Sequence, residues 1–108
     1  MVLNGCETDE SDFTLEVRVT VDDGQVAAQN ALVHIFAPVP NTTVNYYLYT
    51  DEDGMVSLTL KNKAIVDIVA TKNPFRSCTF AEIDRGVNRV DLDMTIYGDP
   101  DSGCRDTL

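Results

Sequence analysis

The sequence has few of the residues that most active sites and nucleic-acid surfaces need. Its 108 residues include no Trp, a single His, and 8 Lys and Arg against 18 Asp and Glu, so the formal net charge is −10. A nucleic-acid surface needs clustered cations to neutralise phosphates. The charge therefore argues against nucleic acid as a partner, and it equally disfavours electrostatic adhesion to anionic lipid.

Long apolar runs are absent as well. No stretch approaches the roughly 18 apolar residues of a membrane-spanning helix. The length is typical of one domain, and a hydrophobic fraction of 44% is ordinary for a globular protein. The sequence therefore predicts a single folded domain with its own core.

Between residues 13 and 96, apolar and polar residues alternate with a period of two. Such alternation predicts strands that bury one face and expose the other. We expect seven strands, at residues 13–21, 31–37, 44–50, 55–60, 64–71, 77–83 and 90–96. Residues 64–71 are apolar on both faces except at Asp67, which favours a central strand. The fold class is therefore all-β, an antiparallel sandwich.

Residues Leu3-Asn4-Gly5-Cys6 resemble a bacterial lipobox, in which a Leu lies three places before a Cys and a small residue directly precedes it. The resemblance implies lipidation of Cys6 and a membrane link through that anchor. The acidic residues at 7, 9, 10 and 12 are similar to a surface-export signal of Bacteroidota-type lipoproteins. They imply an outer-membrane lipoprotein of the bacterial cell envelope that is exposed at the surface. The alternative is an unmodified Cys6 followed by a solvated tether.

Three cysteines are an odd number. If Cys6 carries lipid, Cys78 and Cys104 remain as a disulfide candidate in an oxidising compartment. Two unpaired thiols are the alternative. We accordingly divide the chain into a tether at 1–12, a sandwich domain at 13–97, and a tail at 98–108 that such a bridge would hold against the domain.

Turn and core residues in the segments 17–26, 30–33, 50–56 and 90–92 resemble the transthyretin-like, or carboxypeptidase regulatory-like, domains. They include the turn Asp22-Asp23-Gly24 and the hairpin Thr50-Asp51-Glu52-Asp53-Gly54. The resemblance covers residues 13–96 and implies a seven-stranded Greek-key β-sandwich of prealbumin type. Members of this family are mostly accessory modules that bind protein or carbohydrate, so the resemblance specifies fold better than function.

Two chemistries found on this fold lack their residues here. Hydroxyisourate hydrolases use several His and Arg residues and a Tyr-Arg-Gly-Ser ending, whereas this chain has only His34 and ends Cys-Arg-Asp-Thr-Leu. Isopeptide-forming pilin modules need a Lys on the first strand, where this chain has only Arg18. His34 has no companion nucleophile motif, which favours a structural or surface role. We therefore expect no enzymatic activity and no cofactor.

Two sets of residues are candidate sites. Tyr47 and Tyr49 share one face of a strand, and the neighbouring loop contains Pro40 and Asn41, so together they predict an exposed binding surface. Cross-strand packing is the alternative for the two tyrosines. Asp51 and Asp53 are weak calcium candidates, because they lie in an acidic turn without the remaining ligands of an EF-hand; ordinary turn chemistry is the alternative.

These observations predict a non-catalytic accessory subunit that binds a protein of an outer-membrane or surface assembly. The alternative is a carbohydrate-binding or adhesive surface module, which could be a filament subunit. Acidic residues suit a solvated tether, and rigid strands suit the presentation of loops and a Tyr face.

Overall fold

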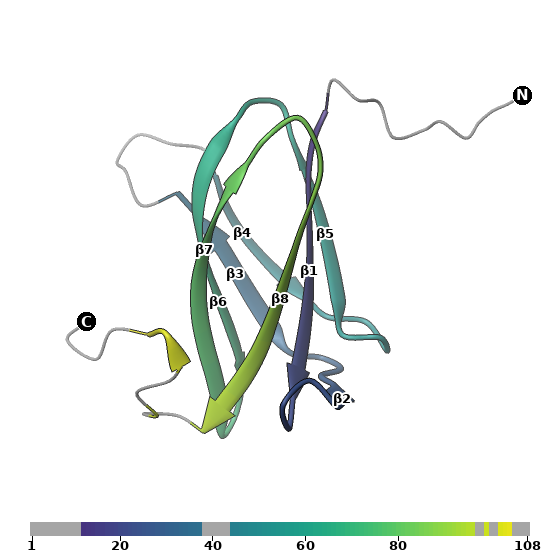
Figure 1. The fold of residues 1–108 in the computed structure, drawn as a ribbon, viewed down its shortest axis with the longest axis vertical. Coiled ribbons are helices and arrows are strands. Elements are labelled where there is room, and N and C mark those ends of the chain that lie inside the picture. The colour runs from purple at the N-terminus through teal and green to yellow at the C-terminus, as the bar shows by residue number, and fades with distance from the viewer. Residues whose placement is uncertain (1–11, 38–43, 97–98, 100–101, 105–108) are drawn as a thin grey trace, which may run out of the picture.

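The strands of the computed structural model curl into two packed layers (Figure 1). The structure describes residues 12–37, 44–96, 99 and 102–104. Its strands are β1 (Phe13–Val21), β2 (Val26–Ala27), β3 (Leu32–Phe36), β4 (Asn45–Tyr49), β5 (Met55–Leu60), β6 (Ala64–Lys72), β7 (Phe75–Ile83) and β8 (Gly86–Ile96). The predicted all-β sandwich is confirmed. Within the described ranges there is no helix of the length and hydropathy that a membrane span needs.

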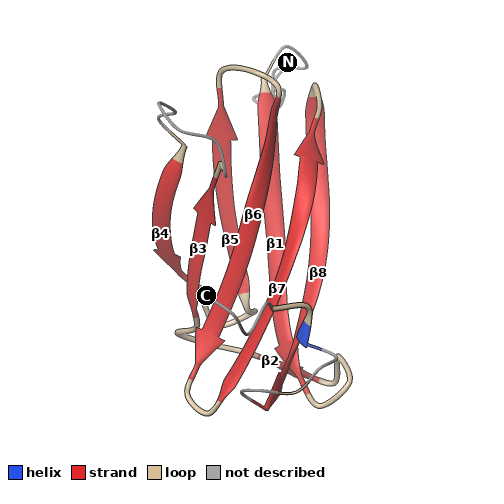
Figure 2. Cartoon of the chain, turned by 90° about the vertical axis from the view of Figure 1, so that its left-hand side faces the viewer, coloured by secondary structure: helices blue, strands red, loops and turns tan. Residues whose placement is uncertain are grey.

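Two layers, sheet A and sheet B, face each other across the core. Sheet A contains β5, β1 and β8, with β2 beside the end of β1, and sheet B contains β4, β3, β6 and β7 in that order. β7 and β8 pair at only two positions, Phe75 with Ile96 and Arg76 with Thr95. The sheets therefore join at this corner and diverge from it, while β4 and β5 are edge strands of the described part of the structure (Figure 2).

One strand pair differs from the predicted antiparallel arrangement. β1 and β8 run parallel, from Phe13 opposite Gly86 to Val21 opposite Met94. Tight hairpins force antiparallel pairing, but β1 and β8 are separated by most of the chain, so either direction is open to them. The result is a mixed, curled sheet rather than a purely antiparallel one.

The core lies between the inner faces of the two sheets and follows the predicted alternation. Each fully buried aliphatic side chain contributes about 1.5–3 kcal/mol relative to exposure. The buried apolar residues are Leu15, Val17, Val19, Ala28, Ala31, Val33, Ile35, Val56, Leu60, Val66, Ile68, Ala70, Ile83, Leu92 and Met94.

Asp93 holds the turn that follows β1. Its Oδ1 accepts hydrogen bonds from the Thr20 hydroxyl and from the Gly24 amide, both at 2.8 Å. Thr20, which alternation assigns to the wet face, is consequently buried. The turn returns the chain to β1 and creates the short strand β2, in a segment whose sequence predicts only an irregular connection.

Gly54 lies directly against the backbone of Val19, just before β5 begins. Its φ is +75°, and an added Cβ would collide with the carbonyl oxygen of Val19. The Gly54 carbonyl accepts the Val19 amide at 2.7 Å, and the Val19 carbonyl accepts the Ala28 amide at 2.9 Å. Glycine is therefore needed here both for the backbone angle and for the close approach.

Candidate functional site

Apolar and aromatic side chains gather on the side of sheet B that faces away from the core. Register places alternate residues of β3, β4, β6 and β7 on this side. We call it the outer face of sheet B, and its apolar and aromatic members are Leu32, His34, Phe36, Tyr47, Tyr49, Ile65, Val69 and Phe80. Four of them are strongly exposed: Phe80 at 72%, Tyr49 at 68%, Tyr47 at 60% and Ile65 at 57%.

The rings gather because of cross-strand register. His34 is opposite Tyr47 on one side and Val69 on the other, and Phe36 is opposite Asn45 and Asp67. Asp67 in turn is opposite Phe80. Residues that face one another across neighbouring strands form a row, and these aromatic residues of three strands occupy two adjacent rows of one surface. Neither the spacing within a strand nor the strand assignments alone could specify this arrangement.

His34 lies in the middle of a stack of rings. Its ring centroid is 4.1 Å from that of Tyr47, with the planes 8° apart, and 4.3 Å from that of Phe36. Its Nε2 is 2.8 Å from Oδ1 of Asn45. These contacts hold the imidazole in one orientation on the surface, in keeping with the structural or surface role expected for it.

β6 is central in the sheet, as the sequence predicts, because it pairs with both β3 and β7. Its two apolar faces differ, however. Val66, Ile68 and Ala70 are buried, whereas Ile65 on the other face is more than half exposed. An apolar sequence on both faces normally marks a strand covered on both sides. Here the described residues leave Ile65 and the neighbouring rings open, and this mismatch identifies the outer face of sheet B as the candidate site.

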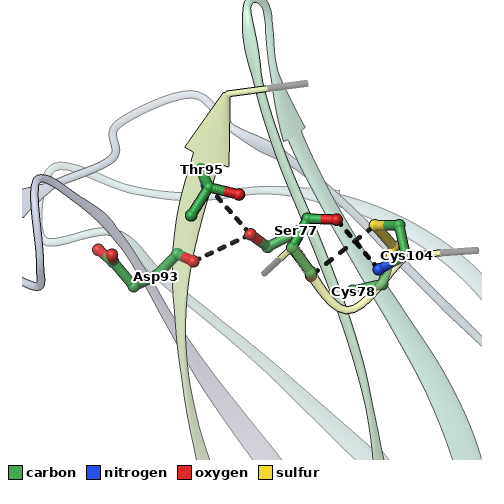
Figure 3. The surroundings of a disulfide bond; sticks show 6 residues. Ser77, Cys78, Asp93, Thr95 and Cys104 are labelled. Atoms are coloured by element: carbon green, nitrogen blue, oxygen red, sulfur yellow. Dashed lines mark hydrogen bonds between the residues drawn. A yellow bond between two sulfur atoms is a disulfide. The ribbon is translucent and has the colours of Figure 1, made fainter. Parts of the chain in front are cut away.

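A disulfide joins Cys78 of β7 to Cys104, the pair that the sequence singles out, with Cα atoms 4.8 Å apart (Figure 3). Gly103 fits beside it with a φ of +80°, and an added Cβ would collide with the Cys78 carbonyl oxygen. Cys78 shares the outer face with Val69, its register partner. The bridge therefore fixes Cys104 at the margin of the candidate site.

The neighbouring Ser77 holds β7 to β8 where the sheets begin to separate. Its buried hydroxyl donates to the Asp93 carbonyl at 2.9 Å and accepts the Thr95 amide at 3.1 Å (Figure 3). These bonds occupy the positions that a backbone ladder would fill if the two strands stayed paired. The side chain thus supports the strand that presents Cys78 and Phe80.

The other predicted site residues fall elsewhere. Oδ1 of Asp51 accepts the amides of Asp53 and Met55, at 2.8 and 3.0 Å, so this carboxylate organises its own turn. Across the described ranges, no three metal-binding side chains come together. Cys6, Pro40 and Asn41 lie outside the described residues. Tyr47 and Tyr49 do share an exposed face, but Phe36, Ile65 and Phe80 were missing from the predicted surface.

Comparisons with known proteins concern the fold. No family model matches the chain, and no curated protein matches its sequence. A DUF3823 family protein from Parabacteroides merdae superposes with a TM-score of 0.64 at 17% identity, over 82% of this chain and 48% of that one. A DUF3823 family protein from Bacteroides uniformis gives 0.60 at 14% identity, over 80% and 44%.

Enzymes share this fold as well. Catechol 1,2-dioxygenase from Pseudomonas arvilla superposes with a TM-score of 0.64 at 12% identity, over 93% of this chain and 57% of that one. This chain therefore spans about half the length of the solved proteins that it resembles. At such identities the likeness establishes the β-sandwich fold alone.

The sequence-based prediction that the chain is not an enzyme is corrected by these matches. Catechol 1,2-dioxygenases from several bacteria are built on the same fold. The sandwich is thus compatible with catalysis, so the absence of the residues of two known chemistries and of a nucleophile motif was too narrow a ground for excluding it. The likeness does not carry the dioxygenase activity over to this chain, since it rests on 10% and 12% identity.

Proposed function

We propose that this protein is a binding module of a bacterial cell envelope, which holds a partner protein against the outer face of sheet B. The observation that carries the proposal is the set of large apolar and aromatic side chains exposed on this face, which flank Asp67 at its centre. Exposed apolar patches of this kind on a folded domain mark interaction surfaces.

The composition of the surface suits a protein partner. Protein interfaces are enriched in Tyr, Phe and Arg, and depleted of Lys, Glu and Asp. Phe80, Tyr47 and Tyr49 present large rings and Arg76 lies on the same side of β7, while Asp67 is an acidic exception between Phe36 and Phe80. Burying each of the large side chains would contribute about 1.5–3 kcal/mol, so a few of them suffice for a specific complex.

A carbohydrate ligand is the second candidate, favoured by the exposure of Tyr49. Sugar binding by stacking needs open ring faces. The imidazole of His34 lies between the rings of Phe36 and Tyr47, so ring faces are used within the protein. The arrangement therefore supports protein contact better than a sugar platform.

The proposed address rests on the N-terminal sequence. The lipobox-like residues 3–6 and the acidic residues that follow would anchor the module through Cys6 at the outer membrane and give it reach. The fold likeness to DUF3823 family proteins from two Bacteroidota adds support for this setting. The module would then act as an accessory subunit of an outer-membrane or surface assembly.

The test is affinity purification from native membranes with paired surface variants. Phe80→Glu places a charge on the outer face of sheet B. Val87→Glu makes the same kind of change on sheet A, where Val87 is 44% exposed. We expect a stoichiometric partner to be recovered with the wild type and with Val87→Glu and lost with Phe80→Glu. Equal recovery with both variants would contradict the proposal.

A further inference from the structure

β4 is an edge strand of the described part of the structure, and its own sequence carries no edge-protecting feature. Among the described strands it pairs only with β3, at one end of sheet B. Edge strands usually carry charges, Pro or bulges that prevent further pairing, but residues 44–50 contain no charged residue, no Pro and no Gly. The other edge strand, β5, has most of its apolar side chains packed into the core, whereas four of the five residues of β4 are exposed.

The backbone of β4 turns three residues towards the open edge. The Ala37 amide donates to the Val44 carbonyl at 3.1 Å, and the Thr50 amide donates to the Ala31 carbonyl at 2.9 Å. In an antiparallel ladder, hydrogen-bonded and non-hydrogen-bonded pairs alternate. With the observed register, Tyr46 and Leu48 are therefore the residues bonded to β3. The amides and carbonyls of Asn45, Tyr47 and Tyr49 point away from β3.

Side-chain geometry agrees with this assignment. Residues in non-hydrogen-bonded pairs lie closer together than those in bonded pairs. Tyr47 is opposite His34, and their rings stack at 4.1 Å. The residues with outward backbone groups are thus the same residues whose side chains lie on the outer face of sheet B. A strand added to β4 would gain main-chain hydrogen bonds and would extend that face at once.

Charge discriminates between the possible added strands. The turn after β4 contains Asp51, Glu52 and Asp53, all exposed. Each copy of the chain has a net charge of −10, so two copies repel each other. A strand with cations at the end that lies beside this turn is attracted.

We propose that β4 binds an extended segment of the partner protein by strand addition, antiparallel to β4. The segment has apolar residues at alternate positions and Lys or Arg at its N-terminal end, next to the turn 51–53. This inference rests on the proposed function and assigns the manner in which the partner is recognised.

The first test uses a defined probe, the synthetic peptide Lys-Lys-Thr-Val-Thr-Val-Thr-Val. Amide hydrogen exchange by NMR reports each backbone position separately. We expect the peptide to slow exchange at Asn45, Tyr47 and Tyr49 by at least about tenfold, the effect of one added hydrogen bond each. Tyr46 and Leu48 are expected to stay unchanged. A peptide with Glu in place of Lys should protect Asn45, Tyr47 and Tyr49 less. Uniform exchange across β4 would overturn the inference.

The same exchange experiment without peptide tests the competing occupant. Protection of Asn45, Tyr47 and Tyr49 that rises with protein concentration would mean that a second copy pairs with β4. That result would overturn the assignment of a cationic partner segment. Exchange that is independent of protein concentration is expected.

Paired substitutions separate this inference from the proposed function. Tyr47→Ala removes the ring and keeps the amide, whereas Tyr47→Pro removes both without affecting a bond to β3. We expect Tyr47→Pro to weaken peptide binding at least about tenfold more than Tyr47→Ala does. Ser57→Pro on β5 is the control, because the register with β1 gives its amide the same outward direction, and it should bind the peptide normally.

Recovery of the native partner then distinguishes the two failures. If Tyr47→Pro and Tyr47→Ala lower the recovery equally while Phe80→Glu abolishes it, the face binds and strand addition is wrong. If Phe80→Glu leaves recovery intact, the proposed function fails, whatever the peptide does. Thermal unfolding of each variant checks that it remains folded.

Discussion

The outer faces of the two sheets are built from the same alternating pattern but differ in the balance of polar pairs and exposed apolar side chains. On sheet A, Thr14 lies opposite Thr59 with hydroxyls 3.3 Å apart, and Arg89 pairs with Glu16 at 3.1 Å. Arg18 lies opposite Asp91. On sheet B the corresponding positions hold Phe80, Ile65 and the stacked rings around His34.

The difference shows which of the two outer faces is suited to contact with water. Polar cross-strand pairs on sheet A satisfy one another and remain hydrated, so that face needs no cover. The apolar side chains on sheet B gain nothing from water. Ile65 and Val69 lie on β6, which is central in the sheet, at positions where a hydrated face would carry polar residues. A bound protein is the cover that we propose for this face.

The largest expected effects contrast the two faces of β6. Ile68 is fully buried, whereas Ile65 on the same strand is more than half exposed. Ile68→Ala should lower the free energy of unfolding by about 3 kcal/mol through lost contacts and a cavity. Ile65→Ala should lower it by less than about 0.5 kcal/mol. Urea unfolding measures both, and similar losses would mean that the outer face is covered within the monomer.

The disulfide at the margin of sheet B should contribute nearly as much. It closes a segment with a sequence separation of 26 between Cys78 and Cys104. The double variant Cys78→Ala/Cys104→Ala should be less stable by about 3 kcal/mol, the entropy of closing a loop of this size. Urea unfolding of the variant, compared with that of the oxidised wild type, tests this value, and the reduced wild type should unfold as the variant does. Stability equal to that of the oxidised wild type would contradict the bridge.

Much of this comparison follows from the sequence, because local patterns determine strands. The strands at 13–21 and 55–60 have the predicted bounds, since alternation and the turns at Gly24 and Gly54 are local signals. β2 was missed because it depends on Asp93, which is distant in the sequence. The parallel pairing of β1 with β8 likewise has no local signal.

The candidate site was only partly predictable for the same reason. Tyr47 and Tyr49 share a face by spacing alone, but their neighbours come from other strands through register. Phe80 joins them only because register aligns it with Asp67 and Phe36, and Phe36 lies next to His34, the partner of Tyr47. The signal available in the sequence was the apolar pattern on both faces of 64–71, which indicated a covered strand, whereas the structure leaves one face open.

A smaller effect is expected on sheet A. Glu16→Gln removes the ion pair with Arg89, whose side chain is highly exposed. Exposed ion pairs contribute about 0.2–1 kcal/mol, so the substitution should lower the free energy of unfolding by an amount in that range. Partner recovery should not change, because this face lies on the opposite layer. A loss of the partner with Glu16→Gln would contradict the proposal that the partner binds the outer face of sheet B.

The smallest effect concerns the polar rim of sheet B at Lys63. Nζ of Lys63 lies 3.3 Å from both Asp84 and Glu82, and these carboxylates, Asp84 first, raise its pKa above 10.5. A raised pKa stabilises the fold fully below the unfolded value and ceases to do so as the pH rises through the folded value. Because the site is exposed, the contribution is slight. The difference in urea midpoint between wild type and Lys63→Met should be small at neutral pH and should vanish in strongly alkaline buffer. A difference that persists there would contradict the attribution of the effect to the charge of Lys63.

The most direct test of the central claim is hydroxyl-radical footprinting of the protein in native envelopes and in purified form. Oxidation of Tyr47, Tyr49 and Phe80 reports the exposure of the outer face of sheet B, and oxidation of Met55 on sheet A is the internal reference. The account predicts that oxidation of the three aromatic residues falls severalfold in the envelope while that of Met55 is unchanged. Equal oxidation of the aromatic residues in both preparations would contradict it.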